Sequence, residues 1–283
     1  MSQQLVSGEV WHSLLAVGGL RKGRSEARET EPVGPVPEAI VERTLEHLSP
    51  TVAAMVRIQL LTAMRPGELV IMSVRDLDMS GPCWEYRPGS WKTEHHQGRA
   101  PRVIDVGPKA QAIIKPFLTL DISGYLFSPQ RAMDEQNAER REERKTPLYD
   151  AHMRHQAKLR KARGRRPLGD HYTVNAYRIA IARACDRAFP HPDFPERLDG
   201  ERAKDFRGRL AAWRAANAEA LDAWKKSHRW HPHQLRHSKA TEIRRLYGAE
   251  AAQSILGHAE LSTTEIYAEK SREMARQIMR EIG

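Results

Sequence analysis

The sequence predicts a mainly α-helical fold with a small antiparallel β-sheet, of the α+β class. Apolar residues recur at helical spacing in three stretches, near residues 49–65, 173–189 and 232–257. Between residues 83 and 106 the pattern changes to short apolar segments separated by a Pro-Gly pair and the polar run KTEHHQG. Apolar residues make up 40% of the 283 positions, which is enough for a sizeable core.

The N-terminal part of the chain is expected to stand apart from the rest. Residues 1–20 have room for one short helix, and the run RKGRSEARETEPVGPVP that follows is charged and spaced by prolines, as in a linker. A domain boundary is therefore predicted near Val36. Residues 1–35 would form a helix and linker, and residues 36–283 one large domain.

The first helix of the large domain has local start and stop signals. Ser49 can cap it and Pro50 suits its first position. Pro66 is expected to end it just after Arg65, because proline disfavours a helical conformation in the residue before it. The apolar face of this helix is formed by Val52, Met55, Val56, Leu60 and Met64.

The short apolar segments that follow are expected to pair as a long β-hairpin. They are rich in aromatic and β-branched residues, which favour strands, and a polar stretch separates them. The residues that predict the two strands are Trp84 and Tyr86, followed by Val103, Ile104 and Val106.

Further helices are predicted in the C-terminal half. One begins at Thr173, with an apolar side formed by Val174, Tyr177, Ile181, Ala184, Cys185 and Ala188. After a polar stretch with three prolines, Pro232 starts a helix that Gly248 can end, and a short helix ends near Gly257. Ser262 and Glu265 form a capping-box pattern, which would set Tyr267 about one turn inside the last helix.

The charge balance indicates a polyanionic partner. The chain has 46 Lys and Arg against 36 Asp and Glu, a formal net charge of +10, and its sequence pI is near 9.8. Nucleic acid is the leading candidate, and a solvated basic surface is the alternative. Both readings also apply to the basic run after Met153 and to an arginine on the helix from Thr173. The residues concerned are Arg154, Lys158, Arg160, Lys161, Arg163, Arg165, Arg166 and Arg178.

Other features of the sequence bear on the cellular location and on metal binding. Cys83 and Cys185 are too few for a disulfide framework, and the sequence has no secretory signal or membrane span, so a cytoplasmic location is expected. Four histidines crowd together near residue 230, which raises the possibility of a zinc site, but no second set of ligands accompanies them. No metal is expected. These histidines are His228, His231, His233 and His237.

One C-terminal stretch concentrates the residues needed to break a phosphodiester without metal ions. Such chemistry requires a nucleophile, cationic donors for the phosphate oxygens and an acid for the leaving alkoxide. His233 and Arg236 stand three apart on a predicted helix and are expected to project from the same face. His258 and the nucleophile candidate Tyr267 follow. Forming a phenolate at neutral pH costs roughly 4 kcal/mol, so nearby cations or a base must offset it.

These motifs resemble those of the tyrosine recombinases, the phage-integrase family. The run HPHQLRH is followed by LGH and by Tyr267, nine residues beyond His258. Upstream, LLTAMRPGEL resembles the family's first-arginine motif at Arg65, with Glu68 as its accompanying acid. The family's hairpin lysine corresponds best to Lys92, in SWKTEHH, with Lys109 as a nearby alternative.

The resemblance implies that residues 36–283 are a recombinase catalytic domain acting on double-stranded DNA. Tyr267 would attack a DNA phosphate to give a 3′-phosphotyrosyl link and a free 5′-hydroxyl. Arg65 and Arg236 would hold the phosphate oxygens, Lys92 would protonate the leaving oxygen, and both His233 and His258 would assist. Neither ATP nor a metal would be needed, and Glu68 is expected to be a structural ion-pair partner of Arg65.

The expected partners and alternatives follow from the same resemblance. A homotetramer is expected on DNA, with a monomer or weak oligomer when free, in a bacterial cytoplasm or nucleoid. Typical members carry an N-terminal helical domain that residues 1–35 are too short to contain. A non-catalytic DNA-binding regulator of a recombination system is therefore the main alternative, and a type IB topoisomerase-like relaxing enzyme is a weaker one.

Overall fold

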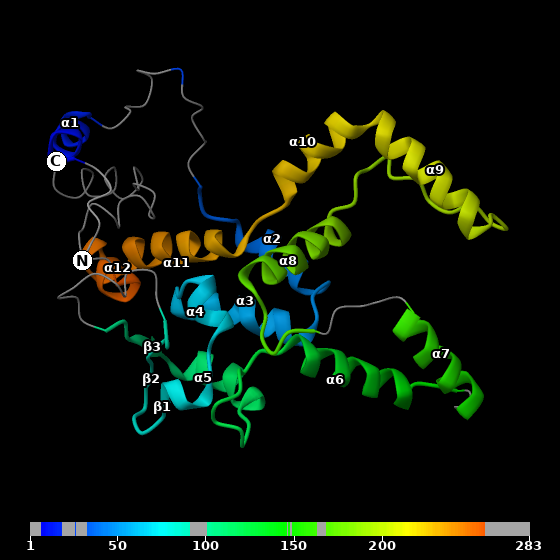
Figure 1. Cartoon of the computed structure of the whole chain (residues 1–283), viewed down its shortest axis with the longest axis horizontal. Coiled ribbons are helices and arrows are strands. Elements are labelled where there is room, and N and C mark those ends of the chain that lie inside the picture. The colour runs from blue at the N-terminus through cyan, green and yellow to red at the C-terminus, as the bar shows by residue number, and fades with distance from the viewer. Residues whose placement is uncertain are drawn as a thin grey trace. The chain divides into compact units, whose positions relative to one another are not determined.

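Helices and one short antiparallel sheet make up the described part of the chain, which confirms the predicted fold class (Figure 1). The computed structural model describes residues 7–18, 26, 33–90, 101–145, 147, 149–162 and 168–257. The chain divides into two units, Met1–Val33 and Gly34–Gly283.

The first unit contains the short helix that the sequence predicts within residues 1–20. Helix α1 (Gly8–Ala16) is capped by Ser7, whose hydroxyl accepts a hydrogen bond from the Val10 amide at 3.4 Å. Every described residue from 7 to 18 is exposed.

The second unit opens with α2 (Glu38–Leu45) and α3 (Pro50–Thr62). The predicted cap and first turn of α3 are confirmed, since the Ser49 hydroxyl accepts from the Val52 amide. The predicted end at Arg65 is wrong. Ala63 adopts a left-handed conformation, with φ 55°, and its amide bonds the Gln59 carbonyl, so the helix stops at Thr62.

A second, very short helix starts where the first was expected to stop. Arg65 has extended backbone and is the N-cap of α4 (Pro66–Val70), in which Pro66 takes the first position. The proline therefore begins a helix here instead of ending one. The backbone turn at residues 63–65 separates the axis of α4 from that of α3.

The sheet has three antiparallel strands in the order β1 (Leu77–Asp78), β2 (Trp84–Tyr86) and β3 (Ile104–Val106). Trp84 pairs with Val106 and Tyr86 with Ile104, so the predicted hairpin pairing is confirmed. The strand β1, which follows the 3₁₀ turn Val74–Asp76, was not predicted. Residues 91–100 of the hairpin lie outside the described residues.

Helices α5 (Pro108–Ile114), α6 (Pro129–Glu142), α7 (Asp150–Ala162) and α8 (Val174–Ala188) follow the sheet, with a 3₁₀ turn at Lys115–Phe117. Helix α8 begins where it was predicted, and the Thr173 hydroxyl caps it by accepting from the Ala176 amide. Val174 is 42% exposed and does not join the buried side of α8, because its first-turn position faces a cavity described below.

The stretch from residue 190 to 231, which carried no helical prediction, contains α9 (Ala203–Ala216) and α10 (Ala218–His228). Every residue of these two helices keeps part of its surface exposed. The last described helices match their predictions: α11 (Pro232–Tyr247) ends at Gly248, with φ 90°, and α12 (Ala249–Leu256) at Gly257, with φ 64°.

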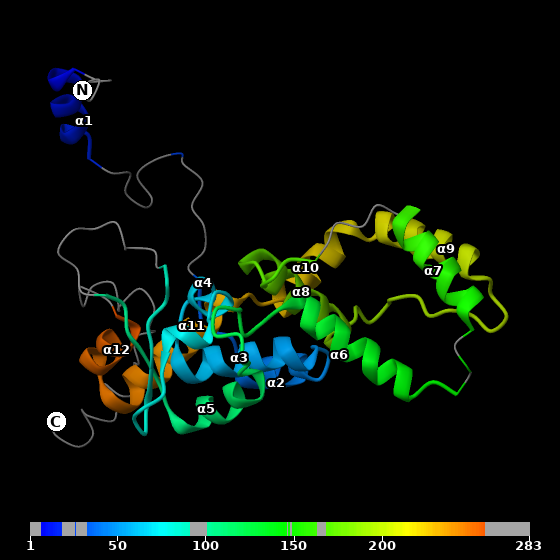
Figure 2. The same cartoon turned by 60° about the horizontal axis from the view of Figure 1, so that its bottom comes forward.

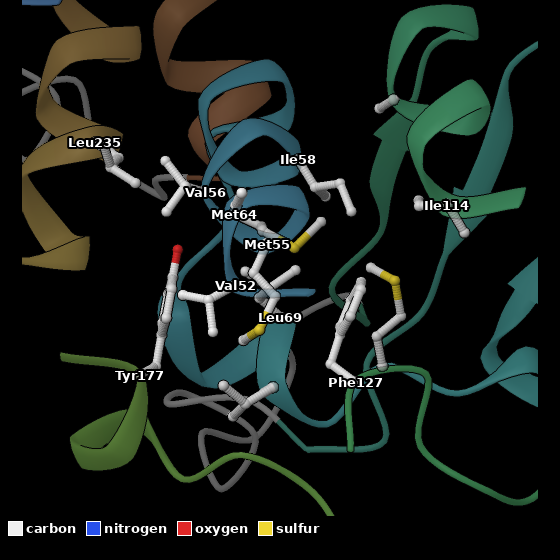
Figure 3. Packing of buried hydrophobic residues seen from close by; sticks show 14 of the residues in the cluster. Val52, Met55, Val56, Ile58, Met64, Leu69, Ile114, Phe127, Tyr177 and Leu235 are labelled. Atoms are coloured by element: carbon white, nitrogen blue, oxygen red, sulfur yellow. The ribbon is translucent and has the colours of Figure 1, made fainter. Parts of the chain in front are cut away.

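Helix α3 lies at the centre of the hydrophobic core. It packs against both α11 and α5, and both views place α11 alongside it (Figures 1 and 2). Met55, Val56 and Ile58 are fully buried and meet Tyr177 of α8 and Leu235 of α11 in one cluster (Figure 3). Burial of each such side chain contributes about 1.5–3 kcal/mol.

One polar side chain inside this core links four parts of the fold. The buried amide of Gln59 donates to the carbonyls of Met64, at 3.2 Å, and Pro232, at 3.0 Å. Its oxygen accepts from the hydroxyl of Tyr177 at 3.1 Å. Gln59 thus joins α3, the turn before α4, α8 and the first residue of α11.

Within the described ranges, every helix is too short or too polar to cross a membrane. The longest of them, α11, has 16 residues and includes three arginines and a lysine.

Replacing Gln59 should destabilise the whole second unit. We expect Gln59→Leu to lower the free energy of unfolding by about 3 kcal/mol or more, because two buried carbonyls and the Tyr177 hydroxyl lose their partners at about 1 kcal/mol or more each. Urea unfolding of the purified variant measures this. Gln130→Leu, at an exposed position on α6, is the control and should stay within about 0.5 kcal/mol of wild type. Equal stability of the two variants would contradict the role of Gln59.

Candidate functional site

A cavity of about 630 Å³ lies where α4, α8 and α11 begin. The first residues of these helices, Pro66, Val174 and Pro232, all line it. The N-termini of α8 and α11 each carry a partial positive charge, which favours an anion. The remaining lining residues are Arg65, Gly67, Glu68, Ile71, Ser90, Arg178, His231 and His233.

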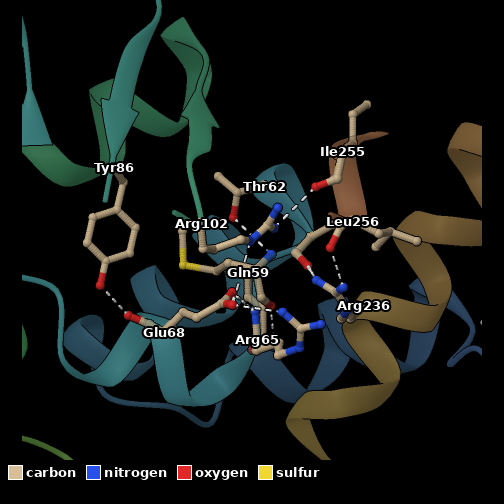
Figure 4. Close-up of polar contacts among 11 residues, drawn as sticks. Gln59, Thr62, Arg65, Glu68, Tyr86, Arg102, Arg236, Ile255 and Leu256 are labelled. Atoms are coloured by element: carbon tan, nitrogen blue, oxygen red, sulfur yellow. Dashed lines mark hydrogen bonds and ion pairs between the residues drawn. The ribbon is translucent and has the colours of Figure 1, made fainter. Parts of the chain in front are cut away.

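Arg65 is held at this cavity by Glu68. The Glu68 carboxylate accepts from the backbone amide of Arg65, at 2.7 Å, and from its Nη1, at 2.9 Å. Glu68 is 2% exposed and Arg65 24%, so the ion pair leaves part of the guanidinium accessible. The backbone carbonyl of Glu68 accepts from the buried Tyr86 hydroxyl at 2.6 Å, which attaches this segment to the sheet (Figure 4). The two residues pair as the sequence led us to expect.

Arg236 is fully buried and points toward two helix ends. Its Nη1 donates to the carbonyl of Ala63 at 2.6 Å and its Nη2 to that of Leu256 at 2.7 Å (Figure 4). These carbonyls lie at the C-terminal ends of α3 and α12, where the helix dipole is negative and unpaired carbonyls need donors. His233 lines the cavity whereas Arg236 does not, so the two side chains do not share one face of the cavity in this structure.

His233 is a neutral imidazole at pH 7. Burial, with smaller contributions from the neighbouring His237 and Arg236, lowers its pKa to about 4. Its ring lies 5.3 Å from that of His237. Burial also lowers the pKa of His231, with a smaller contribution from the charge of Arg178. A neutral His233 can accept a proton or donate a hydrogen bond without adding charge to the cavity.

Arg102 is part of this region, although sequence reasoning did not select it. It lies two residues before β3 and is 9% exposed. Its Nη2 donates to the Ile255 carbonyl at 3.2 Å, and its Nε lies 3.7 Å from the Glu68 carboxylate (Figure 4). Burial lowers its pKa and the charge of Glu68 raises it. The only local signal was an arginine directly before the second predicted strand.

The other predicted site residues fall into three groups. Arg178, exposed on α8, lines the cavity and donates to the Asn175 side chain at 2.9 Å. Arg154 and Lys158 are exposed on α7 and do not line the cavity, and the backbone of Arg160 and Lys161 continues the same helix. The residues that lie outside the described part of the chain are Lys92, Arg163, Arg165, Arg166, His258 and Tyr267.

The crowded histidines have separate surroundings. His228 stacks on Trp224, with ring centroids 3.9 Å apart, whereas His233 packs edge-on against His237. In the described ranges, no three His, Cys, Asp or Glu side chains are grouped as a metal ion would require.

Comparisons with known proteins bear on this arrangement. Residues 200–274 match the model of the phage integrase family. A Tn1549 transposon integrase in complex with a circular intermediate DNA has a similar structure, with a TM-score of 0.51 and 16% identity over 90% of this chain and 67% of that one. The tyrosine recombinase catalytic-domain fold that the sequence predicts is thereby confirmed. The resemblance to the phage integrase family is confirmed for residues 200–274.

Two other recombinases have similar structures, with lower TM-scores. The XerA recombinase matches with a TM-score of 0.48 and 16% identity, over 89% of this chain and 66% of that one. The XerH recombinase bound to its difH substrate matches with a TM-score of 0.44 and 15% identity, over 92% and 58%. The chain thus spans less than two thirds of the length of either protein. No curated protein matches it.

Removing the charge of Glu68 should destabilise the site and the fold together. We expect Glu68→Gln to cost on the order of 3 kcal/mol in the free energy of unfolding, because the buried carboxylate compensates the neighbouring charges of Arg65 and Arg102. The exposed pair of Glu85 and Arg87, 2.6 Å apart on and beside β2, provides the control. Glu85→Gln should cost less than about 1 kcal/mol. Denaturant unfolding compares the two, and equal losses would contradict the buried role of Glu68.

Acidification should weaken the fold through His233. Its pKa falls from 6.5 in the unfolded chain to about 4 in the folded one, so between these values the folded state binds fewer protons. The contribution of His233 to the free energy of unfolding should therefore be fully present above about pH 6.5 and be lost as the pH drops toward 4. Urea titrations across this range should show a shallower pH slope for His233→Gln.

The control for this slope is His155→Gln, at an exposed position on α7, which should retain the wild-type dependence on pH. If the slope of His233→Gln equals that of wild type, the neutral state of His233 in the fold is disproved.

Proposed function

We propose that this chain is a site-specific DNA recombinase or integrase that cleaves and rejoins DNA strands through a 3′-phosphotyrosyl intermediate. The observation that carries the proposal is the cavity in which Arg65, Arg178 and His233 converge beside the N-termini of α8 and α11. A phosphate diester is the anion that this surface suits, because arginine forks match pairs of phosphate oxygens. The family match over residues 200–274 includes the candidate nucleophile Tyr267.

The phosphate would be held by two arginines with different surroundings. Arg65 is partly exposed at the cavity and can meet a nonbridging oxygen directly. Arg236 donates one hydrogen bond from each terminal nitrogen to a backbone carbonyl. Its positive charge would stabilise the negative charge that develops on the phosphate.

The covalent step transfers the phosphoryl group from one oxygen to another. The phenolic oxygen of Tyr267 attacks the phosphorus, and the bond to the 5′-oxygen breaks. A base takes the tyrosine proton, and Lys92 gives a proton to the leaving 5′-oxygen. Attack by a 5′-hydroxyl from another strand reverses the step, so the bond energy is kept and neither ATP nor a metal ion is consumed.

The histidines fit the proton transfers of this scheme. His233, neutral at pH 7, is able to accept the phenolic proton or to donate a hydrogen bond to the phosphate. His258 would act beside it. The cations at the cavity would offset the roughly 4 kcal/mol that phenolate formation costs at neutral pH.

Double-stranded DNA is the proposed partner, and the similar Tn1549 integrase structure is itself a DNA complex. A homotetramer would assemble on the DNA, from a monomer or weak oligomer when free. Arg154, Lys158 and the basic residues after them would contact the DNA backbone. A bacterial cytoplasm or nucleoid is the proposed location.

Trapping of the covalent intermediate tests the proposal. A suicide substrate, nicked close to the cleavage site so that the released strand diffuses away, should leave the protein attached to DNA. Tyr267→Phe should abolish the adduct, because phenylalanine has no nucleophilic oxygen. Tyr247→Phe, at a tyrosine that is 74% exposed at the end of α11, should form it normally. The adduct is detected as a slower band in a denaturing gel.

Three outcomes would refute the proposal. An unchanged adduct in Tyr267→Phe would mean that another residue is the nucleophile. DNA binding without any adduct, with a verified site and long incubation, would instead identify a non-catalytic DNA-binding protein. Relaxation of supercoiled plasmid without recombinant products would indicate a topoisomerase-like activity.

A further inference from the structure

The C-terminal end of α12 is bonded by two arginines from elsewhere in the chain. Helix ends leave carbonyls without intrahelical partners, and buried ones need donors. Arg102 donates to the Ile255 carbonyl at 3.2 Å, and Arg236 donates to the Leu256 carbonyl at 2.7 Å. The end of α12 is therefore fixed by side chains from the sheet region and from α11, in addition to its own packing.

Gly257 allows Arg102 to approach this helix end. Its φ of 64° is a conformation that other residues rarely adopt, and a Cβ atom at this position would overlap the Arg102 guanidinium. Arg102 therefore lies directly against the last residue before His258.

The other side of the Arg102 guanidinium faces the Arg65 pair. Its Nε lies 3.7 Å from Oε1 of Glu68, the same oxygen that accepts from Nη1 of Arg65 at 2.9 Å. Glu68 is thus shared by two arginines. A continuous set of contacts runs from Arg65 through Glu68 and Arg102 to the end of α12, as Figure 4 shows.

We infer that Arg102 is a positioning residue, which holds the end of α12 at a fixed distance from Arg65. The chain leaves α12 at Gly257 and continues directly to His258 and Tyr267, so this contact would set where the nucleophile-bearing segment starts relative to the phosphate-binding arginine. This inference rests on the proposed function. Arg102 acts through its neighbours: it is 9% exposed and does not line the cavity, its Nη2 bonds the Ile255 carbonyl, and its Nε lies within ion-pair distance of Glu68.

Only an arginine has the geometry for this contact. The guanidinium presents Nε and Nη2 in a rigid plane, one toward the carboxylate and the other toward the carbonyl. A lysine has one nitrogen at the end of a flexible chain and cannot meet both acceptors in this way. Arg102→Lys therefore keeps the charge and removes the bridge.

The first experiment separates positioning from binding and from folding. Wild type, Arg102→Lys and Arg102→Ala are prebound in excess to a nicked suicide substrate, and adduct is followed with time. We expect the rate constant of Arg102→Lys to fall about 10- to 100-fold, because a misplacement of about 1 Å costs up to that factor. DNA affinity by gel shift should change less than about threefold, which corresponds to under about 1 kcal/mol. Arg87→Lys, exposed beside the sheet, is the matched control and should behave as wild type.

The shape of the time course distinguishes a merely structural role. Partial unfolding would lower the final amount of adduct and leave the rate constant of the folded fraction unchanged. Loss of positioning would lower the rate constant and leave the final amount close to wild type. A wild-type rate constant in Arg102→Lys would overturn the inference.

The second experiment remains informative if wild type forms no adduct and the proposed function fails. Hydrogen exchange of the free protein reports on α12 without DNA. Backbone amides at residues 249–257 should exchange about tenfold faster or more in Arg102→Lys, whereas those of α5 should keep their wild-type rates. Unchanged exchange rates in α12 would show that Arg102 does not stabilise the end of this helix, independently of any activity.

Discussion

The buried charge of Arg236 is the constraint on which the rest of the site depends. A buried guanidinium is costly unless acceptors meet its donors, and here two backbone carbonyls accept one hydrogen bond from each of its terminal nitrogens. Those carbonyls exist as acceptors only because α3 stops at Thr62 and α12 stops at Leu256. The burial of Arg236 therefore requires that both α3 and α12 end where they do. These two hydrogen bonds of Arg236 bring the turn before Arg65 close to the end of α12, which leads to His258.

Around this charge the core combines apolar packing with a few polar contacts that fix direction. The cluster on α3, α8 and α11 contributes most of the burial, but apolar contacts alone tolerate small shifts of one helix along another. The Gln59 amide removes that freedom, since its partners belong to three other segments. Glu68 does the same between α4 and the sheet, through its carbonyl to Tyr86 and its carboxylate to Arg65. The cavity keeps its form because each wall is attached by at least one directional bond.

The sequence predicted those features that local chemistry determines. The start of α3 follows from Ser49 and Pro50, and the ends of α11 and α12 follow from glycines. The predicted end of α3 was wrong because Ala63 adopts a left-handed conformation, in which its carbonyl bonds Arg236. This bond is a tertiary contact and leaves no local signal in the sequence. Helices α9 and α10 were not predicted because the stretch was read as polar from Pro190, Pro192 and Pro195, and these three prolines all precede α9.

The same distinction holds for the site. Arg65, Glu68 and His233 were found from motif spacing, and the structure brings them to one cavity. The inward direction of Arg236 could not be found in this way, because helical spacing gives a face and not a partner. Arg102 could not be found either, since its partner Ile255 is 153 positions away. Residues that act through distant backbone carbonyls leave no local pattern.

The long reach of these contacts also sets when the site can form during synthesis. Arg236 is added 173 residues after Ala63, so at bacterial or eukaryotic translation rates it follows roughly 10–35 s later. Until then the Ala63 carbonyl has no guanidinium to bond, and the turn that presents Arg65 is incomplete. The basic helix α7 is therefore synthesised well before the contacts that complete the site. The order of residues along the chain thus delays completion of the site until Arg236 has been added.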